Sequence, residues 1–296
     1  MNHKPYEKVE RLAKEDCEGL LDGKVHIFEK LDGTNGVIWC GDDEICYGSK
    51  SQKLTEENSN RGFFNCLPPK HPLGELLRDL KYVYVFGEWL VKHTVQYPDS
   101  CYKKFYVFDI FDGRTFRFFT YEELSKLCEG LKIKEYSLEN KDVVQLITPL
   151  SIMTNPTQIM IEEQIGRSKI VPHGEGIVLK NYNFINKFGR CIYGKLVDEK
   201  FKEVAHKPKK LKSHIVTEEW LADKYCTEAR ARKIWAKYAM DNIKDPKEIP
   251  MLSGYAFKDT VEEEIFSMIK DVKETPINFR NLQRAITKKV RDFILK

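Results

Sequence analysis

The chain has 296 residues, of which 42% are hydrophobic and 32% charged, and its formal net charge at pH 7 is +4. No apolar run approaches the roughly 20 residues that a membrane-spanning helix requires, and the charged N-terminus lacks the apolar stretch of a secretory signal, so we expect no membrane partner and an intracellular location, cytoplasmic or nuclear. The eight scattered cysteines show no zinc-binding spacing and agree with that compartment as reduced thiols.

The first two thirds of the chain alternate predicted strands with a few helices. The hydrophobic pattern predicts a short helix over 5–17, strands over 25–28 and 37–39, and a hairpin over 40–47. The later elements are an irregular loop over 54–72, strands over 82–88, 105–111, 175–180 and 190–197, and helices over 73–81, 120–130 and 156–165. A mixed α and β domain is therefore expected here.

The composition changes at the basic, proline-containing segment 205–212, and we place a domain boundary there, giving domains 1–205 and 206–296. Beyond the boundary the sequence predicts three helices, over 217–241, 259–274 and 278–295, and no strand. Residues 206–296 contain 20 basic and 14 acidic side chains. This excess favours an anionic partner, nucleic acid first, although a solvated lysine-rich surface gives the same pattern. RNA contact through Lys288, Lys289 and Arg291 is the corresponding hypothesis.

The chain is organised around residues 29–36, which lie between two predicted strands and combine Lys30 with two glycines and two carboxylates. Gly33 and Gly36 permit a tight turn and the close approach of a ligand. Taken alone, residues 29–36 fit a plain hairpin whose lysine reaches solvent as well as they fit a catalytic turn. Polar residues also stand at the ends of other strands: Lys50, Glu88, Asp109, Glu175, Lys180 and Lys195. Lysines gathered with carboxylates suit a triphosphate and its divalent metal, and no P-loop sequence is present to supply such a site.

These motifs, in this order, resemble those of the covalent nucleotidyltransferases, the polynucleotide ligases and mRNA capping enzymes. The matching segments are Lys30 to Asn35 (motif I), Ser49-Lys50 (motif Ia), Phe86-Gly87-Glu88 (motif III), Phe105 to Ile110 (motif IIIa), Glu175 to Lys180 (motif IV) and Lys195 (motif V). The subgroup that the chain resembles most is the ATP-dependent RNA ligases. The resemblance implies an α+β fold: a nucleotidyltransferase domain of antiparallel sheets with flanking helices, followed by a small all-helical C-terminal domain that engages RNA.

The resemblance also implies a role for each predicted site residue. Lys30 is the catalytic nucleophile that attacks the α-phosphate of ATP, and neighbouring cations favour its neutral amine. Glu29 accepts a hydrogen bond from the adenine amine, which favours ATP over GTP. The other roles are ribose binding for Asn35 and Glu88, adenine stacking for Phe108, phosphate binding for Lys50, Lys180 and Lys195, a Mg²⁺ or Mn²⁺ site at Glu175, and orientation or structure for Asp32, Gly33 and Asp109.

The implied activity joins the 3′-OH and 5′-phosphate ends of RNA through lysyl-AMP and RNA-adenylate, as in RNA repair or editing, with no obligate protein partner. A DNA ligase or capping guanylyltransferase with an atypical C-terminus is an alternative, although those enzymes usually carry a β-barrel domain after motif V. A non-catalytic RNA-binding protein on a degenerate ligase fold is another. Two residues favour this non-catalytic alternative. Lys50 stands where arginine is common, and Tyr193 stands where RNA ligases usually have a basic residue. Glu175 and Lys180 are five residues apart, so a regular pleat points them to opposite faces.

Overall fold

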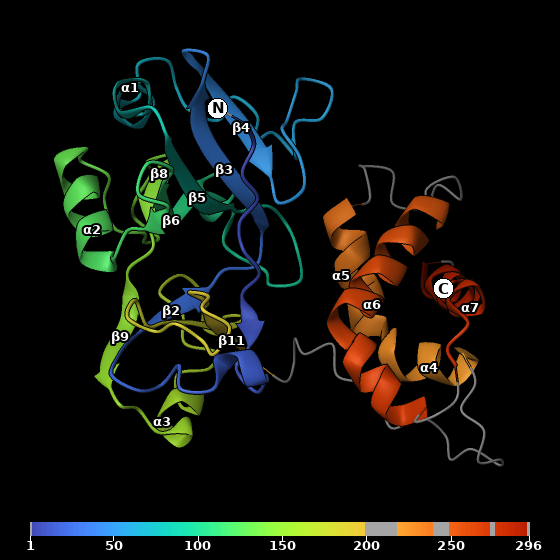
Figure 1. The fold of residues 1–296 in the computed structure, drawn as a ribbon. Helices are drawn as coiled ribbons and strands as arrows, with labels where there is room; N and C mark the ends of the chain where they lie inside the picture. The colour runs from blue at the N-terminus through green and yellow to red at the C-terminus, as the bar shows by residue number, and fades with distance from the viewer. Residues whose placement is uncertain (1, 199–217, 239–248, 273–275, 295–296) are drawn as a thin grey trace. The chain divides into compact units, whose positions relative to one another are not determined.

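The structure is a computed structural model that describes residues 2–198, 218–238, 249–272 and 276–294 (Figure 1). It divides the chain into two compact units, Met1–Asp198 and Glu199–Lys296. The predicted boundary between residues 205 and 206 lies outside the described residues. The mixed α and β class, with antiparallel sheets followed by C-terminal helices, is confirmed.

The first sheet carries the lysine of motif I. Its strands, in spatial order, are β1 (Glu10–Arg11), β11 (Gly194–Val197), β10 (Gly176–Lys180), β2 (Lys24–Lys30) and β9 (Pro149–Thr154). All neighbours are antiparallel except β1 and β11. Alternate residues of β2 and β10, among them Ile27 and Ile177, pack with α3 (Gln158–Glu162) in a buried cluster. The opposite face is therefore left to Phe28, Lys30 and Lys180, because side chains alternate along a strand.

The second sheet supplies motifs Ia, III and IIIa. Its spatial order is β4 (Glu44–Ser49), β3 (Thr34–Gly41), β5 (Val83–Trp89), β6 (Phe105–Asp112) and β7 (Arg117–Phe118), with β8 (Val144–Leu146) parallel to β6. The predicted hairpin joins β3 to β4 through Asp42 and Asp43, whose φ angles of 53° and 65° suit the tight turn that twisted strands prefer.

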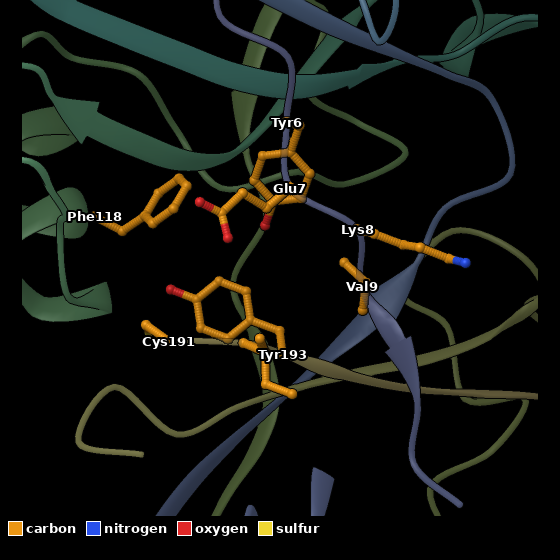
Figure 2. Close-up of a pocket in the computed structure, with 8 residues that line it drawn as sticks. Tyr6, Glu7, Lys8, Val9, Phe118, Cys191 and Tyr193 are labelled. Carbon is orange, nitrogen blue, oxygen red and sulfur yellow. The ribbon is translucent and has the colours of Figure 1, made fainter. Parts of the chain in front are cut away.

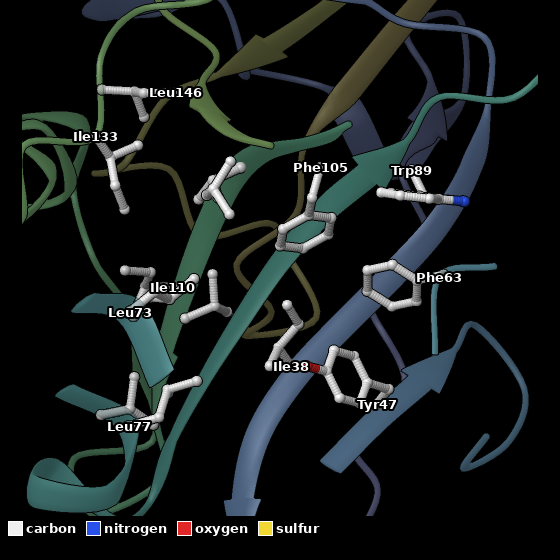
Figure 3. Close-up of a cluster of buried hydrophobic side chains, with 14 of the residues drawn as sticks. Ile38, Tyr47, Phe63, Leu73, Leu77, Trp89, Phe105, Ile110, Ile133 and Leu146 are labelled. Carbon is white, nitrogen blue, oxygen red and sulfur yellow. The ribbon is translucent and has the colours of Figure 1, made fainter. Parts of the chain in front are cut away.

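One face of this second sheet holds a large hydrophobic core. Ile38, Val85 and Ile110 from its central strands pack against α1 (Pro72–Leu80) and α2 (Tyr121–Gly130), as Figure 3 shows for the cluster. Helix α2 begins at a capping box in which Thr120 and Glu123 satisfy each other's backbone amides. The opposite face, with Val37, Trp39 and Phe86, forms a second aromatic cluster. This face meets the first sheet at the motif residues.

The C-terminal unit consists of helices in its described part: α4 (Glu218–Tyr225), α5 (Glu228–Tyr238), α6 (Ile249–Val272) and α7 (Phe279–Ile294). Leucine, isoleucine and valine side chains from one side of α7 enter its core: Leu282, Ile286, Val290 and Ile294. Their four-residue spacing is the apolar stripe of an amphipathic helix. No helix among the described residues has the length and apolar character needed to span a membrane.

Three predicted elements are wrong in their extent or type. The single helix over 217–241 is two helices, because Thr227 accepts a hydrogen bond from the Arg230 amide (3.2 Å) and starts α5 anew. Helix α6 begins at Ile249 and not at 259, since Pro250 occupies its first turn, where a missing N–H costs nothing. The predicted strand 190–197 begins only at Gly194.

The expected helix over 5–17 is also wrong. The segment is extended, pairs as β1 with β11, and ends in a short 3₁₀ turn, Glu15–Cys17. Its apolar spacing mimics a helix, but Tyr6 lies in the aromatic cluster of the second sheet while Leu12 packs in the cluster of the first. Tertiary contacts with both sheets therefore outweigh the local helical pattern.

Candidate active site

The motif I turn joins the two sheets. Lys30 is the last residue of β2, and β3 begins four residues later at Thr34. The Gly33 amide donates to Glu88 Oε1 on β5 (2.9 Å), and a Cβ at Gly33 would lie 2.5 Å from the Trp89 carbonyl oxygen. Only glycine fits this close approach to β5, which explains the K-x-D-G sequence in packing terms.

Asp32 is held by the loop that follows β5. Its Oδ2 accepts the Val95 amide (2.8 Å), its own amide donates to the Tyr97 hydroxyl (3.0 Å), and His93 Nδ1 lies 2.5 Å from its Oδ1. Asp32 is 3% exposed. Burial opposes its ionisation, yet His93 and then Lys30 lower the pKa of Asp32 to about 2. The predicted orienting role agrees with this fully engaged carboxylate.

Lys30 and the residues of motifs IV and V share one face of the first sheet. In the register, Lys30 is opposite Gly176, Phe28 is opposite Val178, and Val178 is opposite Lys195, and residues opposite each other project to the same side. The Lys30 ammonium contacts the carboxylate of Glu175, which is 2% exposed. Glu175 stands one residue before β10, so the pleat does not prevent it from reaching this face.

Asn35 and Glu88 form a second part of the site on the other sheet. They are direct partners between β3 and β5, so their side chains lie on one face, as the shared ribose role requires. Glu88 accepts the Gly33 amide, which couples it to the motif I turn. The Asn35 Oδ1 atom is buried and has no hydrogen-bond partner among the described residues. A buried acceptor in this state is suited to a ligand hydroxyl.

Glu29 lies in a separate, enclosed environment. Its carboxylate accepts hydrogen bonds from the Tyr136 hydroxyl (2.8 Å), the Lys169 amide (3.1 Å) and the Ser168 hydroxyl. Burial raises its pKa, and these donors oppose the rise. An ionised carboxylate offers about four acceptor positions. Three are taken by these donors, so roughly one acceptor position of Glu29 remains for a donor on a nucleobase.

Lys180 forms a buried ion pair between the two sheets. Its ammonium donates to Asp109 Oδ1 (2.7 Å) and to the Phe108 carbonyl (2.8 Å), and it lies 5.0 Å from the ring centroids of Phe28 and Tyr193. Burial lowers the pKa of Lys180 and raises that of Asp109, while their mutual attraction opposes both shifts. This arrangement favours a structural role for Lys180, and its phosphate contact stays a prediction.

Phe108 is half-buried at an irregularity in the pairing of β5 and β6. Such a bulge redirects side chains next to it. The Tyr6 ring lies edge-on to Phe108, with centroids 4.9 Å apart, and the Tyr6 hydroxyl donates to Asp109. The N-terminal segment thus buttresses motif IIIa, a contribution that no motif in the sequence indicated.

The remaining predicted residues are the lysines of motifs Ia and V. Lys50 is exposed just after β4, and Lys195 is half-buried in β11. The structure brings Lys30, Glu175 and Lys195 to one sheet face and Asn35, Glu88 and Gly33 to the turn beside it. Sequence reasoning missed several partners that the fold supplies: His93, Val95, Tyr97, Tyr136 and Ser168. The segment 90–97 carried a signal in the sequence, since Val91, Val95 and Tyr97 alternate there with polar residues around a lone histidine.

A small pocket, drawn in Figure 2, lies outside this constellation. Its lining comes from residues 6–9, Phe118 and residues 191–193, and includes none of the predicted site residues. The Tyr6 and Tyr193 side chains that border it are the ones that pack around Asp109 and Lys180. The pocket is a by-product of this aromatic packing, and we assign it no ligand.

Two antiparallel sheets that meet at a lysine-bearing turn, with carboxylates and further lysines around it, are the arrangement of a covalent nucleotidyltransferase. The chain matches the RNA ligase family over residues 23–196, more than half of its length, and it belongs to that family. A search of the curated proteins finds no significant match.

Solved structures of Naegleria gruberi RNA ligase have a similar fold. A variant without ligand gives a TM-score of 0.50 at 21% identity, the protein with pyrophosphate 0.50 at 20%, and a variant with ATP and Mn 0.51 at 22%. The alignments cover 66–67% of this chain and 56–57% of the Naegleria chains. The chain thus spans less than two thirds of those proteins, and the likeness concerns the fold.

Proposed function

We propose that this protein is an ATP-dependent RNA ligase that joins RNA 3′-OH and 5′-phosphate ends. The observation that carries the proposal is the Lys30 amine at the end of β2, in contact with buried Glu175 and on the same sheet face as Lys195. Membership of the RNA ligase family supports the substrate class. A binding module has no need of a lysine held in this way, which disfavours the non-catalytic alternative.

The proposed reaction consists of three displacements at phosphorus. The Lys30 amine releases a proton to solvent when it attacks and regains one when AMP is transferred, and the RNA 3′-hydroxyl releases its proton to solvent in the last step. The Lys30 Nζ atom forms a bond to the α-phosphorus of ATP, and pyrophosphate leaves. An RNA 5′-phosphate oxygen then attacks the same phosphorus, the N–P bond breaks, and RNA-adenylate forms. Finally the RNA 3′-hydroxyl attacks the 5′-phosphate and AMP leaves. The cationic side chains of Lys195 and Lys50 are proposed to stabilise the negative charge that these displacements move between phosphates.

The nucleoside is proposed to lie against both sheets. Asn35, with its unpartnered Oδ1, and Glu88 are assigned to the ribose hydroxyls. The half-buried rings and methyls of Phe108 and Val178 offer apolar surface for the base. The last acceptor position of Glu29 is assigned to the adenine amine. Guanine presents a carbonyl at that place, and two facing acceptors repel, so ATP is favoured.

A divalent metal fits this site only in company with the nucleotide. The described part of the chain contains no group of three histidine, cysteine or acidic side chains that could hold a metal ion. Mg²⁺ commonly binds through one or two carboxylates together with substrate phosphates and water. Glu175 is the carboxylate we assign to it, and Mg²⁺ or Mn²⁺ supplies charge neutralisation at the phosphates.

The C-terminal unit is proposed to engage RNA through α7. Four exposed cations lie on one side of that helix at spacings of four, four and three residues: Arg280, Arg284, Lys288 and Arg291. They extend over about 16 Å at the rise of an α-helix, a stripe that complements several phosphates of an RNA strand. Lys289, which the sequence hypothesis included, instead pairs with Asp223 (2.9 Å) within the unit.

The covalent step is the first test. The protein is incubated with α-phosphate-labelled ATP and magnesium, denatured, and examined for label on the chain, with Lys30→Ala and labelled GTP as controls. Label from ATP that is lost in Lys30→Ala is the expected result. Label from GTP alone indicates a capping guanylyltransferase. Absence of label from either nucleotide, in folded protein that is not already adenylylated, contradicts the proposal and favours a binding module.

A further inference from the structure

The residues that hold Asp32 come from one loop and converge on the turn that follows the nucleophile. Val95, Tyr97 and His93 contact the carboxylate or the amide of Asp32 at 2.8, 3.0 and 2.5 Å. The histidine is 6% exposed and Asp32 is 3% exposed. Both carboxylate oxygens are therefore occupied by protein groups, and Asp32 is unsuited to bind a metal or to accept a proton from Lys30.

Among these three contacts, only that of His93 joins a side chain of the loop to the Asp32 carboxylate, because Val95 uses its backbone amide and the Tyr97 hydroxyl accepts from the Asp32 amide. Neither ring nitrogen of His93 makes a hydrogen bond to another group among the described residues, so the Asp32 carboxylate, 2.5 Å from Nδ1, is the nearest acceptor for a proton on that atom. A buried carboxylate without such a partner is costly. Loss of the His93 imidazole lets the Asp32 carboxylate turn toward the nearest cation. Lys30 is close enough to act on the ionisation of Asp32. A Lys30 amine drawn to Asp32 is displaced from the nucleotide.

We infer that His93 is a positioning residue for the adenylylation step. By holding Asp32 against the loop 90–97, His93 keeps the motif I turn in place and leaves the Lys30 amine directed to its substrate. This inference rests on the proposed function. It also assigns the loop after motif III a specific task in the first chemical step. The later sealing of adenylylated RNA does not use the Lys30 amine as a nucleophile, so it depends less on His93.

His93→Leu removes the N–H at similar volume, and His93→Asn restores a donor near the position of Nδ1. For His93→Leu we expect single-turnover formation of lysyl-AMP at saturating ATP to fall about 100-fold, as a misplaced reactive group commonly causes. The KM for ATP and the sealing of pre-adenylylated RNA stay within about threefold of wild type. His93→Asn recovers most of the lost rate. Val91→Ala, a buried change in the same loop, controls for general loosening.

Each other outcome overturns the inference. Equal loss of lysyl-AMP formation and of sealing indicates a general structural role, and so does an equal loss in Val91→Ala. No loss in His93→Leu shows that the histidine is dispensable. A wild-type chain that forms no lysyl-AMP contradicts the proposed function. Deuterium exchange then tests separately whether His93 holds Asp32 in place. Exchange at the Val95 amide, whose acceptor is Asp32, must accelerate in His93→Leu and not in Val91→Ala.

Discussion

The ion pair between Lys180 and Asp109 gives a quantitative prediction about the fold. The pair is 2.7 Å long, and the two side chains are 2% and 0% exposed. Lys180→Met removes the ammonium at similar volume and leaves Asp109 with the Tyr6 hydroxyl as a donor. Removing one partner of a buried pair costs about 3–5 kcal/mol. At about 2–4 °C per kcal/mol for a unit of this size, the melting transition of Met1–Asp198 should fall by about 6–20 °C.

The same variant should show a characteristic pH dependence. Burial raises the pKa of Asp109 in the intact pair, and loss of the lysine raises it further, since no cation then opposes the burial term. A carboxyl whose pKa is higher in the folded than in the unfolded state stabilises the fold when protonated, and this stability is lost as the pH rises through the folded pKa. The deficit of Lys180→Met should therefore be smaller at pH 5 than at pH 8.

Calorimetry of the full chain at both pH values measures these effects. The matched control is Lys180→Met combined with Asp109→Asn, which removes the stranded charge and should recover most of the loss, because neutral replacement of a buried pair is often tolerated. A Lys180→Met protein that melts within 2 °C of wild type has lost at most about 1 kcal/mol of unfolding free energy, and this result refutes the reasoning. So does a double variant that melts no higher than the single one.

Three further predictions concern other parts of the chain. Glu175→Gln removes the charge that holds Lys30 and should slow lysyl-AMP formation about 100-fold or more in the labelling assay. Arg230→Met strands acidic partners of a fully buried guanidinium and should lower the melting transition of the C-terminal unit by about 12 °C or more. Arg284→Gln with Lys288→Gln should make the slope of log affinity for single-stranded RNA against log salt shallower by about 1.4, since each phosphate contact contributes about 0.7.

Controls keep these three results interpretable. Glu175→Gln keeps an acceptor for Lys30, whose side chain is 23% exposed and remains open to water, so its melting temperature should fall by no more than about 4 °C. A labelling rate within threefold of wild type contradicts the proposed role. For the C-terminal unit, an unchanged transition in Arg230→Met shows that the buried cation is not needed. For RNA binding, Lys289→Gln is the matched control, because that lysine pairs with Asp223 within the unit; an equal effect on the salt slope contradicts the assignment of the α7 stripe.

The strands that bear the motifs were predicted closely from the sequence. The apolar runs that became β5, β6 and β10 end within one or two residues of the predicted bounds, because alternation and β-branched or aromatic residues are local signals. The antiparallel sheet class and the family followed from the order of short motifs along those strands. The helical character of the C-terminal unit followed from periodicity, although caps and the tolerance for Pro250 moved its boundaries.

The sequence by itself thus determined the motif-bearing strands, the family and the place of Lys30 at the end of a strand before a glycine turn. Only the tertiary structure decided what each of them contacts. Asp32 meets His93 sixty-one residues further along the chain, and Glu29 meets Ser168 at a separation of 139. Lys180, for which the motif predicts a phosphate contact, pairs with Asp109, 71 residues earlier in the chain. Pairings of this kind depend on how two sheets face each other, and buried charge must find a partner there, so no local pattern encodes them.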